Sequence, residues 1–422
     1  MHVDDMILIS IDDHVVEPPD MFSGHLPSRY LDQAPHVVLT EEGKSQWVFE
    51  DQEMAMVGLN AVVSWPKEEW GFNPTAHAEM RPGAYNIHER VRDMNRNGVL
   101  ASMCFPSMAG FSGRTFQEAK DKDLALVMLK AYNDWHIDEW CGAYPGRFIP
   151  QAILPLWDMG ATIAELQRVA EKGARAVSMP ELPHVQGYPS YHSDSWDPFF
   201  AAICDVDLVM SLHIGQGLNA INLPDINFDE YMVLSTQVTV LAVQDLLWGH
   251  AMREFPALKI AFSEGGIGWL PFLLDRVDRH YQNQRWTGQD FGLKLPSDVL
   301  REHSLACFIA DPTSLKLYKE IGIDMIAFET DYPHSDCLWP DAPEALLIQC
   351  EGAGCSDEDV DKISWQNAAR FCGWDPFASI SRPDATVGAL RAQAGDVETG
   401  VVSRAEWRAR YEAKPYYATA SV

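Results

Sequence analysis

Short apolar runs that alternate with amphipathic segments are the sequence feature that most restricts the fold of this chain. Most of the runs end at a proline or at a polar residue, and the segments between them have helical periodicity. Continuous apolar runs separated by helices are typical of a parallel sheet with helices outside it. The expected strands are Met6–Ile11, Leu100–Phe105, Phe148–Leu154, Ala174–Met179, Asp207–His213, Lys259–Ser263, Leu305–Ala310 and Asp324–Phe328.

The number of these units favours a closed barrel over an open sheet. About eight β/α units are the count of a (β/α)₈ TIM barrel. A doubly wound sheet would need a glycine-rich phosphate turn after its first strand, and the first run is followed by none. We therefore expect an α/β barrel over residues 1–375. Residues 376–422 form a tail with a short helical pattern at Arg404–Tyr411, which docks on its own barrel or on a neighbouring subunit.

Residues 21–90 interrupt the alternation and are too long for a plain loop, so we expect an insertion that covers one mouth of the barrel. Two β-rich runs, His36–Thr40 and Gln46–Glu50, predict a hairpin within it. Arg81 lies near its end. This arginine either binds a substrate carboxylate or forms a surface salt bridge, which is the commoner role of an arginine in a loop.

Charge and composition exclude several classes of protein. The net charge of −29 and the pI near 4.7 argue against nucleic acid or an anionic membrane as partner, because both require clustered Lys and Arg. No apolar run reaches membrane-spanning length, and residues 1–20 lack the pattern of a signal peptide, so a cytoplasmic protein is expected. The eight cysteines are scattered without a CxxC pair, which indicates core thiols.

Polar side chains follow the expected strands at the ends where barrels carry their active sites. The first run continues into Asp12-Asp-His14, and residues two apart leave the same face of a strand. Four carboxylates and three imidazoles at one mouth would need one or two bound cations for electrostatic balance. The predicted metal-binding set is Asp12, His14, Glu17, His213, Glu264, Asp331 and His334.

Each member of this set also has a purely structural interpretation. The stretch around Asp12 is rich in turn residues, and Asp331 could be a turn acid before Tyr-Pro. His213 could be a hydrogen-bonded core histidine, and Glu264, which precedes Gly-Gly, could cap the next helix. Their coincidence at strand ends nevertheless favours a metal site. Among the other histidines, His250 is the one to examine in a structure.

Several motifs between Met6 and Phe371 point to a family. They are Asp12-Asp-His14 with Glu17-Pro-Pro-Asp20, Asp93-Met-Asn-Arg-Asn-Gly-Val99 with Phe105-Pro-Ser107, Leu212-His-Ile-Gly215, Glu254-Phe-Pro256 with Ser263-Glu-Gly-Gly-Ile-Gly-Trp-Leu-Pro271, Thr330-Asp-Tyr-Pro-His334, and Asn367-Ala-Ala-Arg370. With them, the chain resembles the amidohydrolase-related family, in the branch of aminocarboxymuconate-semialdehyde decarboxylase.

The resemblance implies a distorted (β/α)₈ barrel with a metal held by Asp12, His14, His213 and Asp331. Asp12 stands where many relatives carry a histidine or a glutamate. Glu264 occupies the place where the decarboxylases and many hydrolases keep a catalytic histidine, which argues against simple decarboxylation.

Glu17, Glu264 and His334 remain as possible ligands of a second ion. We expect Asp12, His14 and His213 on one ion and these three on the other, with Asp331 bridging or accepting a proton. Oxygen-rich ligation favours Mn/Fe or Fe/Fe, with zinc as the alternative.

Three functions follow from this site. The favoured one is an O₂-activating monooxygenase that hydroxylates a small organic substrate. The alternative is a metal-dependent hydrolase of amides, esters or lactones, or a decarboxylase, in which Asp331 takes a proton from metal-bound water. The third is a catalytically silent subunit that stabilises an active partner. A homo-oligomer, or a hetero-oligomer with a related barrel subunit, is expected.

Overall fold

The computed structural model describes residues 1–50, 52–54, 57–71 and 73–413, which form two compact units. Unit 1 comprises Met1–Trp157, Thr330–Glu344 and the residues from Pro376 onward. Unit 2 comprises Asp158–Glu329 and Ala345–Asp375. The chain therefore leaves unit 1 after Trp157 and returns to it twice.

Within the described residues, eight strands correspond to the predicted β/α series. Unit 1 holds β1 (Ile9–Val15), β5 (Ala101–Pro106) and β6 (Gln151–Ile153), and unit 2 holds β7 (Ala176–Met179), β8 (Val209–His213), β9 (Lys259–Ser263), β10 (Ser304–Phe308) and β11 (Ile326–Phe328). Strands β1 and β5 pair in parallel. In unit 2, strands β7 to β11 lie side by side in chain order, and the register of β7 with β8, β8 with β9, β9 with β10 and β10 with β11 is parallel. This confirms the predicted α/β class.

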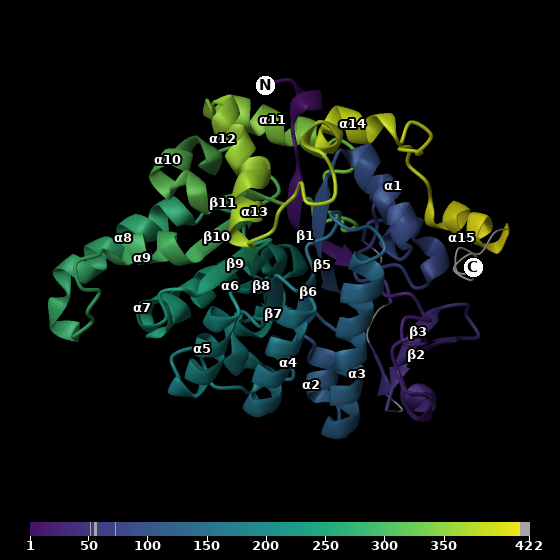
Figure 1. Cartoon of the computed structure of the whole chain (residues 1–422), viewed down its shortest axis with the longest axis horizontal. Helices are drawn as coiled ribbons and strands as arrows, with labels where there is room; N and C mark the ends of the chain where they lie inside the picture. Colours follow the sequence, from purple (N-terminus) through teal and green to yellow (C-terminus); the bar gives the residue numbers. More distant parts are fainter. Residues whose placement is uncertain (51, 55–56, 72, 414–422) are drawn as a thin grey trace. The chain divides into compact units, whose positions relative to one another are not determined.

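Helices follow the strands of unit 2 and lie outside them, as α8, α9 and α10 do beside β9 to β11 (Figure 1). They are α4 (Met159–Glu171), α5 (Asp197–Asp205), α6 (Phe228–Trp248), α7 (Ala251–Glu254), α8 (Leu270–Asn283), α9 (Pro296–His303), α10 (Tyr318–Ile321), α12 (Asp357–Asp361) and α13 (Asn367–Phe371). Helix α11 (Ala342–Ala353) begins in unit 1 and continues into unit 2. Among the described residues, none of the helices has the length and apolar character that a membrane crossing requires.

Unit 1 contains α1 (Ile87–Asn97), α2 (Arg114–Glu118), α3 (Lys122–Asp134), α14 (Val387–Ala392) and α15 (Arg404–Ala413). The helical segment between β5 and β6 is divided. Asp121 accepts hydrogen bonds from the main-chain N–H groups of Asp123 and Leu124 and so begins α3 anew. Helix α3 then continues as a π-helix, η6 (Trp135–Cys141).

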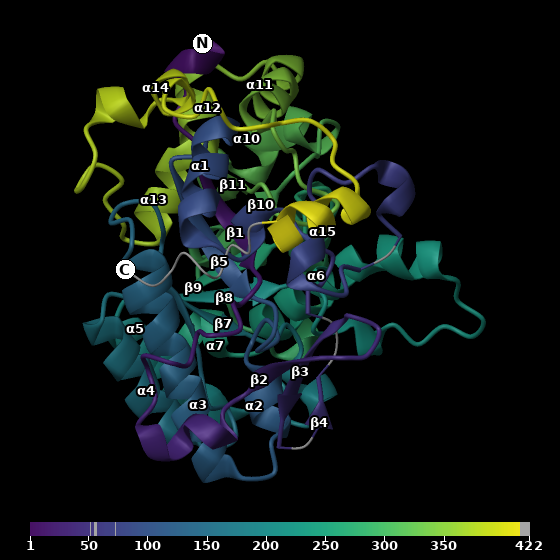
Figure 2. The ribbon, with the colours of Figure 1, turned by 90° about the vertical axis from the view of Figure 1, so that its right-hand side faces the viewer.

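The predicted hairpin of the insertion is present. Strands β2 (His36–Leu39) and β3 (Ser45–Phe49) pair in antiparallel fashion, and β4 (Gln52–Glu53) adds to β3 (Figure 2). The hairpin turn includes Gly43, whose φ of +71° suits glycine. That the insertion covers the mouth of a site stays a prediction.

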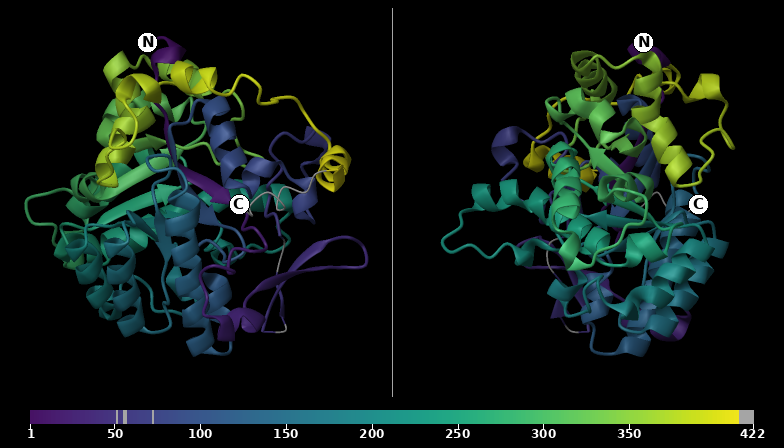
Figure 3. Two further views of the ribbon diagram at one scale, coloured as in Figure 1. Left: turned by 45° about the vertical axis from the view of Figure 1, so that its right-hand side comes forward. Right: turned by 90° about the vertical axis from the view of Figure 1, so that its left-hand side faces the viewer.

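The C-terminal tail docks on the insertion of its own chain. Helix α15 packs against the 3₁₀ turn η4 (His77–Glu79), and Figure 3 shows the yellow α15 beside blue and purple segments of unit 1. Arg408 forms an ion pair of 2.9 Å with the buried Glu79. An apolar cluster also stabilises the packing of the tail on the insertion. Its buried members are Val62, Trp65, Val402 and Trp407.

Candidate metal centre

Strand β1 is buried at every position, and a bulge re-aims its polar residues. Its register with β5 shifts between Ser10, which pairs with Ser102, and Asp13, which pairs with Cys104. Such a bulge places an extra residue on one strand and turns the side chains that follow. Asp12 and His14 consequently approach each other, with 3.6 Å between Oδ1 and Nε2, as predicted for residues on one face.

Asp13 serves the fold beside this site. Its carboxylate accepts hydrogen bonds from the Ser102 hydroxyl, from the Thr330 hydroxyl and from the Tyr332 main-chain N–H, the last at 3.0 Å. Burial raises the pKa of Asp13, against the nearby positive charge of Arg90 and these hydrogen bonds. Asp13 thus fastens residues 330–332 to β1, a role that the sequence did not reveal.

Main-chain hydrogen bonds place Asp331 directly against β1. The Asp331 N–H donates to the Asp12 carbonyl at 2.9 Å, and the His14 N–H donates to the Tyr332 carbonyl at 2.7 Å. Asp331 has a φ of +51°, a conformation that is unfavourable for a residue with a side chain. These two bonds hold that conformation, and strain of this kind is common at functional sites.

His14, Asp331 and His334 form a buried cluster with metal-binding chemistry. Asp331 Oδ1 lies 3.2 Å from His14 Nε2 and 2.9 Å from His334 Nδ1. The two imidazole rings stack with their centroids 3.8 Å apart. Each residue offers one ligand atom, and these atoms lie within 4.8 Å of one another. Burial favours a protonated Asp331, yet the two imidazoles hold its pKa below the ordinary value.

The donor atoms of this cluster suit a divalent cation. A carboxylate and two imidazoles are ligands that transition metals prefer. His334 Nε2 is buried and has no hydrogen-bond partner among the described residues. Buried polar atoms are normally satisfied, so a buried imidazole nitrogen without a protein partner, beside a carboxylate, is suited to bind an ion.

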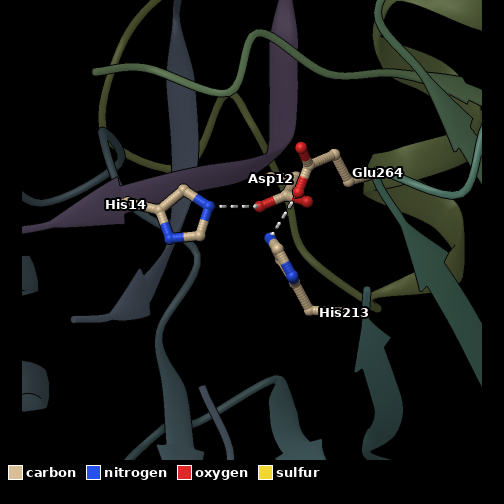
Figure 4. Close-up of side chains that lie close together, drawn as sticks. All are labelled: Asp12, His14, His213 and Glu264. Atoms are coloured by element: carbon tan, nitrogen blue, oxygen red, sulfur yellow. Dashed lines mark ion pairs between the residues drawn. The ribbon is translucent and has the colours of Figure 1, made fainter. Parts of the chain in front are cut away.

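Unit 2 presents a second carboxylate–imidazole pair. His213 is the last residue of β8 and Glu264 follows β9; His213 Nε2 lies 3.3 Å from Glu264 Oε2. His213 Nδ1 contacts the Ile214 carbonyl, the kind of contact that fixes the tautomer of metal-binding histidines. Figure 4 shows this ion pair and the one between Asp12 and His14. Each unit thus supplies residues of the predicted metal set.

Glu264 has an unusual main chain. Its φ is +58°, and its N–H points to the carboxylate of Glu329, with 3.1 Å to each oxygen. Glu329 follows β11 and is buried. It therefore positions Glu264. The sequence could have identified Glu329, because an acidic residue there directly follows an apolar strand.

The structure does not place Glu17 in either group of possible metal ligands among the described residues. Its carboxylate accepts hydrogen bonds from the main-chain N–H groups of Met108 at 2.7 Å and Ser107 at 3.1 Å. Burial raises its pKa to about 7, although these hydrogen bonds oppose the shift. Its predicted role as a ligand stays a prediction.

Arg81 forms a buried ion pair within the protein. Its Nε and Nη2 each lie 2.7 Å from one oxygen of Asp93, and Nη2 also donates to the Glu398 carbonyl. The guanidinium lies over the ring of Trp339, 4.5 Å from its centroid. The salt bridge is therefore buried and not at the surface, while a role of Arg81 in binding substrate stays a prediction.

Two further residues complete the account of unit 2. His250 lies 2.5 Å from Asp197 and belongs to neither possible metal group. Glu181, which the sequence analysis missed, follows β7 after Pro180 and is buried. It accepts hydrogen bonds from the Gly217 N–H at 3.2 Å and the Thr239 hydroxyl at 3.3 Å, and burial raises its pKa to about 8.

Comparisons with known proteins agree on one family. The model of the Amidohydrolase family matches residues 47–374. The chain is 26% identical to gamma-resorcylate decarboxylase of Rhizobium sp. (strain MTP-10005) over 241 residues, which are 51% of this chain and 69% of that protein.

Solved structures share the fold. An amidohydrolase from Mycobacterium avium subsp. paratuberculosis K-10 superposes with a TM-score of 0.67 and 19% identity, covering 87% of this chain and 99% of that one. A dihydroxybenzoic acid decarboxylase from Polaromonas sp. JS666 was solved with manganese and 2-nitroresorcinol. It superposes with a TM-score of 0.60 and 20% identity, covering 87% of this chain and 96% of that one. The likeness confirms the predicted TIM barrel.

The expected monooxygenase function is wrong. Two of the three similar proteins described above are decarboxylases, and none of the three is named an oxygenase. The expectation depended on a count of seven ligands, but main-chain N–H groups engage the Glu17 carboxylate. The alternative that included decarboxylation is the better supported one.

Proposed function

Since the chain belongs to the amidohydrolase family, we propose that this enzyme is a divalent-metal-dependent lyase that decarboxylates a small aromatic acid. The observation that carries the proposal is the buried cluster of His14, Asp331 and His334. The named activities of the Rhizobium and Polaromonas decarboxylases support the reaction and the substrate class.

The family resemblance implies an ion on Asp12, His14, His213 and Asp331, and three of these residues, Asp12, His14 and Asp331, lie together in unit 1. Manganese is the proposed metal, because the Polaromonas decarboxylase contains it and because these ligands balance oxygen with nitrogen. A bound ion would supply positive charge that holds and polarises the oxygen atoms of an acidic substrate. A second ion on Glu17, Glu264 and His334, as in the expected Mn/Fe or Fe/Fe pair, would make the metal content two per chain.

Asp331 and two residues outside the proposed ligand set, His334 and Glu264, handle protons. Decarboxylation replaces a carbon–carbon bond by a carbon–hydrogen bond, so an acid must deliver a proton to the carbon that loses CO₂. The contact of 2.9 Å between Asp331 Oδ1 and His334 Nδ1 provides a path along which that proton can be held and passed on. Glu264, whose side chain is 22% exposed, is the least buried of the predicted ligands and is a second carboxyl that can meet the substrate.

The test is an assay of CO₂ release from dihydroxybenzoates and carboxyvanillate after the protein has been loaded with manganese. We expect turnover of at least one of these acids and its loss in Asp331→Asn. His250→Asn is the matched control, because His250 is also paired with an aspartate but lies outside the proposed site. Hydrolysis of amides, esters or lactones without CO₂ release would instead establish the hydrolase alternative.

Oligomeric state and cellular location stay predictions. A small-molecule substrate is consistent with the relatives, whose names specify aromatic acids. A homo-oligomer would be identified by its mass in solution. A hetero-oligomer with a related barrel would require a second polypeptide that copurifies with this one.

A further inference from the structure

The C-terminal end of helix α11 has a geometry that brings two cysteines together. Gly354 follows the helix with a φ of +74°. The Cys355 N–H donates to the Cys350 carbonyl at 3.0 Å, and the Gly354 N–H donates to the Glu351 carbonyl at 3.1 Å. These two bonds define a Schellman motif, in which Cys350 and Cys355 occupy the two positions whose side chains characteristically contact each other.

In most helices those two positions carry apolar residues, whereas here both carry thiols. Disulfides join residues whose Cα atoms are roughly 4.4–6.8 Å apart, and residues that share a main-chain hydrogen bond are near neighbours. The interaction of the thiols is also reflected in their pKa values: Cys350 lowers the pKa of Cys355, and Cys355 raises the pKa of Cys350.

Exposure divides the roles of the two thiols. Cys350 is buried, whereas Cys355 is partly exposed and can meet a small solute. The burial of Cys355 and the negative charge of Asp359 raise the pKa of its thiol, whereas the positive charge of Lys319 lowers it and so favours the thiolate. A partly exposed thiol with a second thiol beside it is the usual arrangement of a redox-sensitive cysteine.

We infer that Cys350 and Cys355 form a reversible dithiol–disulfide site, with Cys355 as the thiol that meets a hydroperoxide and Cys350 as the thiol that resolves it. The site lies at the end of α11 in unit 2. Oxidation would covalently fix the helix end, since the bond would close a loop of only six residues.

The chemistry balances with one hydroperoxide. The Cys355 thiolate attacks one peroxide oxygen, the O–O bond breaks, and the leaving oxygen takes up a proton to become water or an alcohol. Cys355 is then a sulfenic acid. The Cys350 sulfur attacks the Cys355 sulfur, the S–O bond breaks, and hydroxide leaves with the Cys350 proton as water. The two thiols lose two electrons and the peroxide gains them.

The experiment uses the full chain, purified under reducing conditions and then treated with hydrogen peroxide. Free thiols are alkylated under denaturing conditions, disulfides are reduced, and the released thiols receive a second label. Trypsin leaves Glu320–Lys362 as one peptide, which contains Cys337, Cys350 and Cys355. We expect the second label on Cys350 and Cys355, while Cys337 and the other five cysteines carry the first.

Variants separate the two roles. Cys350→Ser should form no disulfide and should accumulate a sulfenic acid on Cys355, which dimedone captures. Cys355→Ser should form neither product at this site. Cys204→Ser is the matched control, because Cys204 is also partly exposed in unit 2, and it should behave as the unaltered protein. Circular dichroism confirms that each variant is folded.

Two outcomes would overturn the inference. One is the recovery of all eight cysteines with the first label after peroxide treatment. The other is oxidation of Cys355 to a sulfinic acid without any disulfide to Cys350, which would mean that the buried thiol cannot reach it. Treatment of the oxidised protein with dithiothreitol should reduce the disulfide, so that Cys350 and Cys355 again receive the first label.

Discussion

Replacing Arg81 by methionine will destabilise unit 1, because the change leaves a buried carboxylate without its cation. Arg81 and Asp93 are 5% and 3% exposed, and two contacts of 2.7 Å join them. After the replacement, the Asp93 carboxylate keeps the hydroxyl of Tyr332, which donates at 2.6 Å. Methionine retains part of the arginine's apolar contact but no positive charge.

The expected magnitude follows from the burial of the pair. Removing one partner of a buried ion pair costs about 3–5 kcal/mol, and the lost contact with Trp339 adds roughly 0.5–2 kcal/mol. The entropy of unfolding is about 2.1 cal/mol/K per residue, which for 422 residues gives about 0.9 kcal/mol/K. The combined loss of about 3.5–7 kcal/mol therefore lowers the midpoint of cooperative thermal unfolding by about 4–8 °C.

Calorimetry of Arg81→Met and Arg114→Met measures the difference. Arg114 also pairs with an acid, Glu118, but both side chains are more than half exposed, so its replacement should cost less than about 0.5 kcal/mol. Equal midpoints for the two variants would refute the argument from burial. A raised KM at an unchanged midpoint would return Arg81 to the role of substrate clamp.

Three further predictions concern the site and its surroundings. Asp331→Asn should lower kcat by about 10²-fold or more in the CO₂ assay with the fold intact, and near-normal turnover would remove Asp331 from the mechanism. Chelation should abolish turnover and manganese should restore it, whereas full activity in metal-free protein would contradict a metal enzyme. Glu181 has its pKa raised by burial from 4.5 to about 8, so the folded state binds more protons between these values and stability falls as pH rises through them. Glu181→Gln should therefore become more stable relative to the unaltered protein by up to roughly 3–5 kcal/mol from pH 5 to 9; parallel melting curves across that range would contradict the prediction.

The strand ends were predictable because they depend on local pattern. Polar residues such as His213, Glu264 and Asp331 mark where the apolar runs end. Asp12 and His14 were expected to follow the first strand, but they lie within the buried strand β1. The same rule would have found Glu181, but Pro180 separates it from its strand. Family motifs then added the identity of the fold, which the comparisons confirmed.

Contacts between distant segments could not be predicted. Arg81 and Asp93 both occur in the printed sequence without any signal that they form a pair, because their approach depends on how the insertion packs. Glu17 was expected at a metal for its proximity to His14, yet its carboxylate turns to the main chain at Ser107 and Met108. A carboxylate can be neutralised by N–H groups as well as by a cation, and the sequence does not distinguish the two.

The hydrogen bonds between β1 and residues 330–332 have a consequence for how the protein is made. Tyr332 and Asp13 are 319 positions apart in the chain, yet the cluster around Asp331 exists only when they meet. During synthesis, the ribosome must add the whole stretch from β1 to Tyr332 before β1 can acquire this neighbour. Contacts of such long sequence separation form slowly, so the apolar residues of β1 are exposed to aggregation and to chaperones in the interval. A nascent chain that stalls before Thr330 cannot bind metal through this cluster.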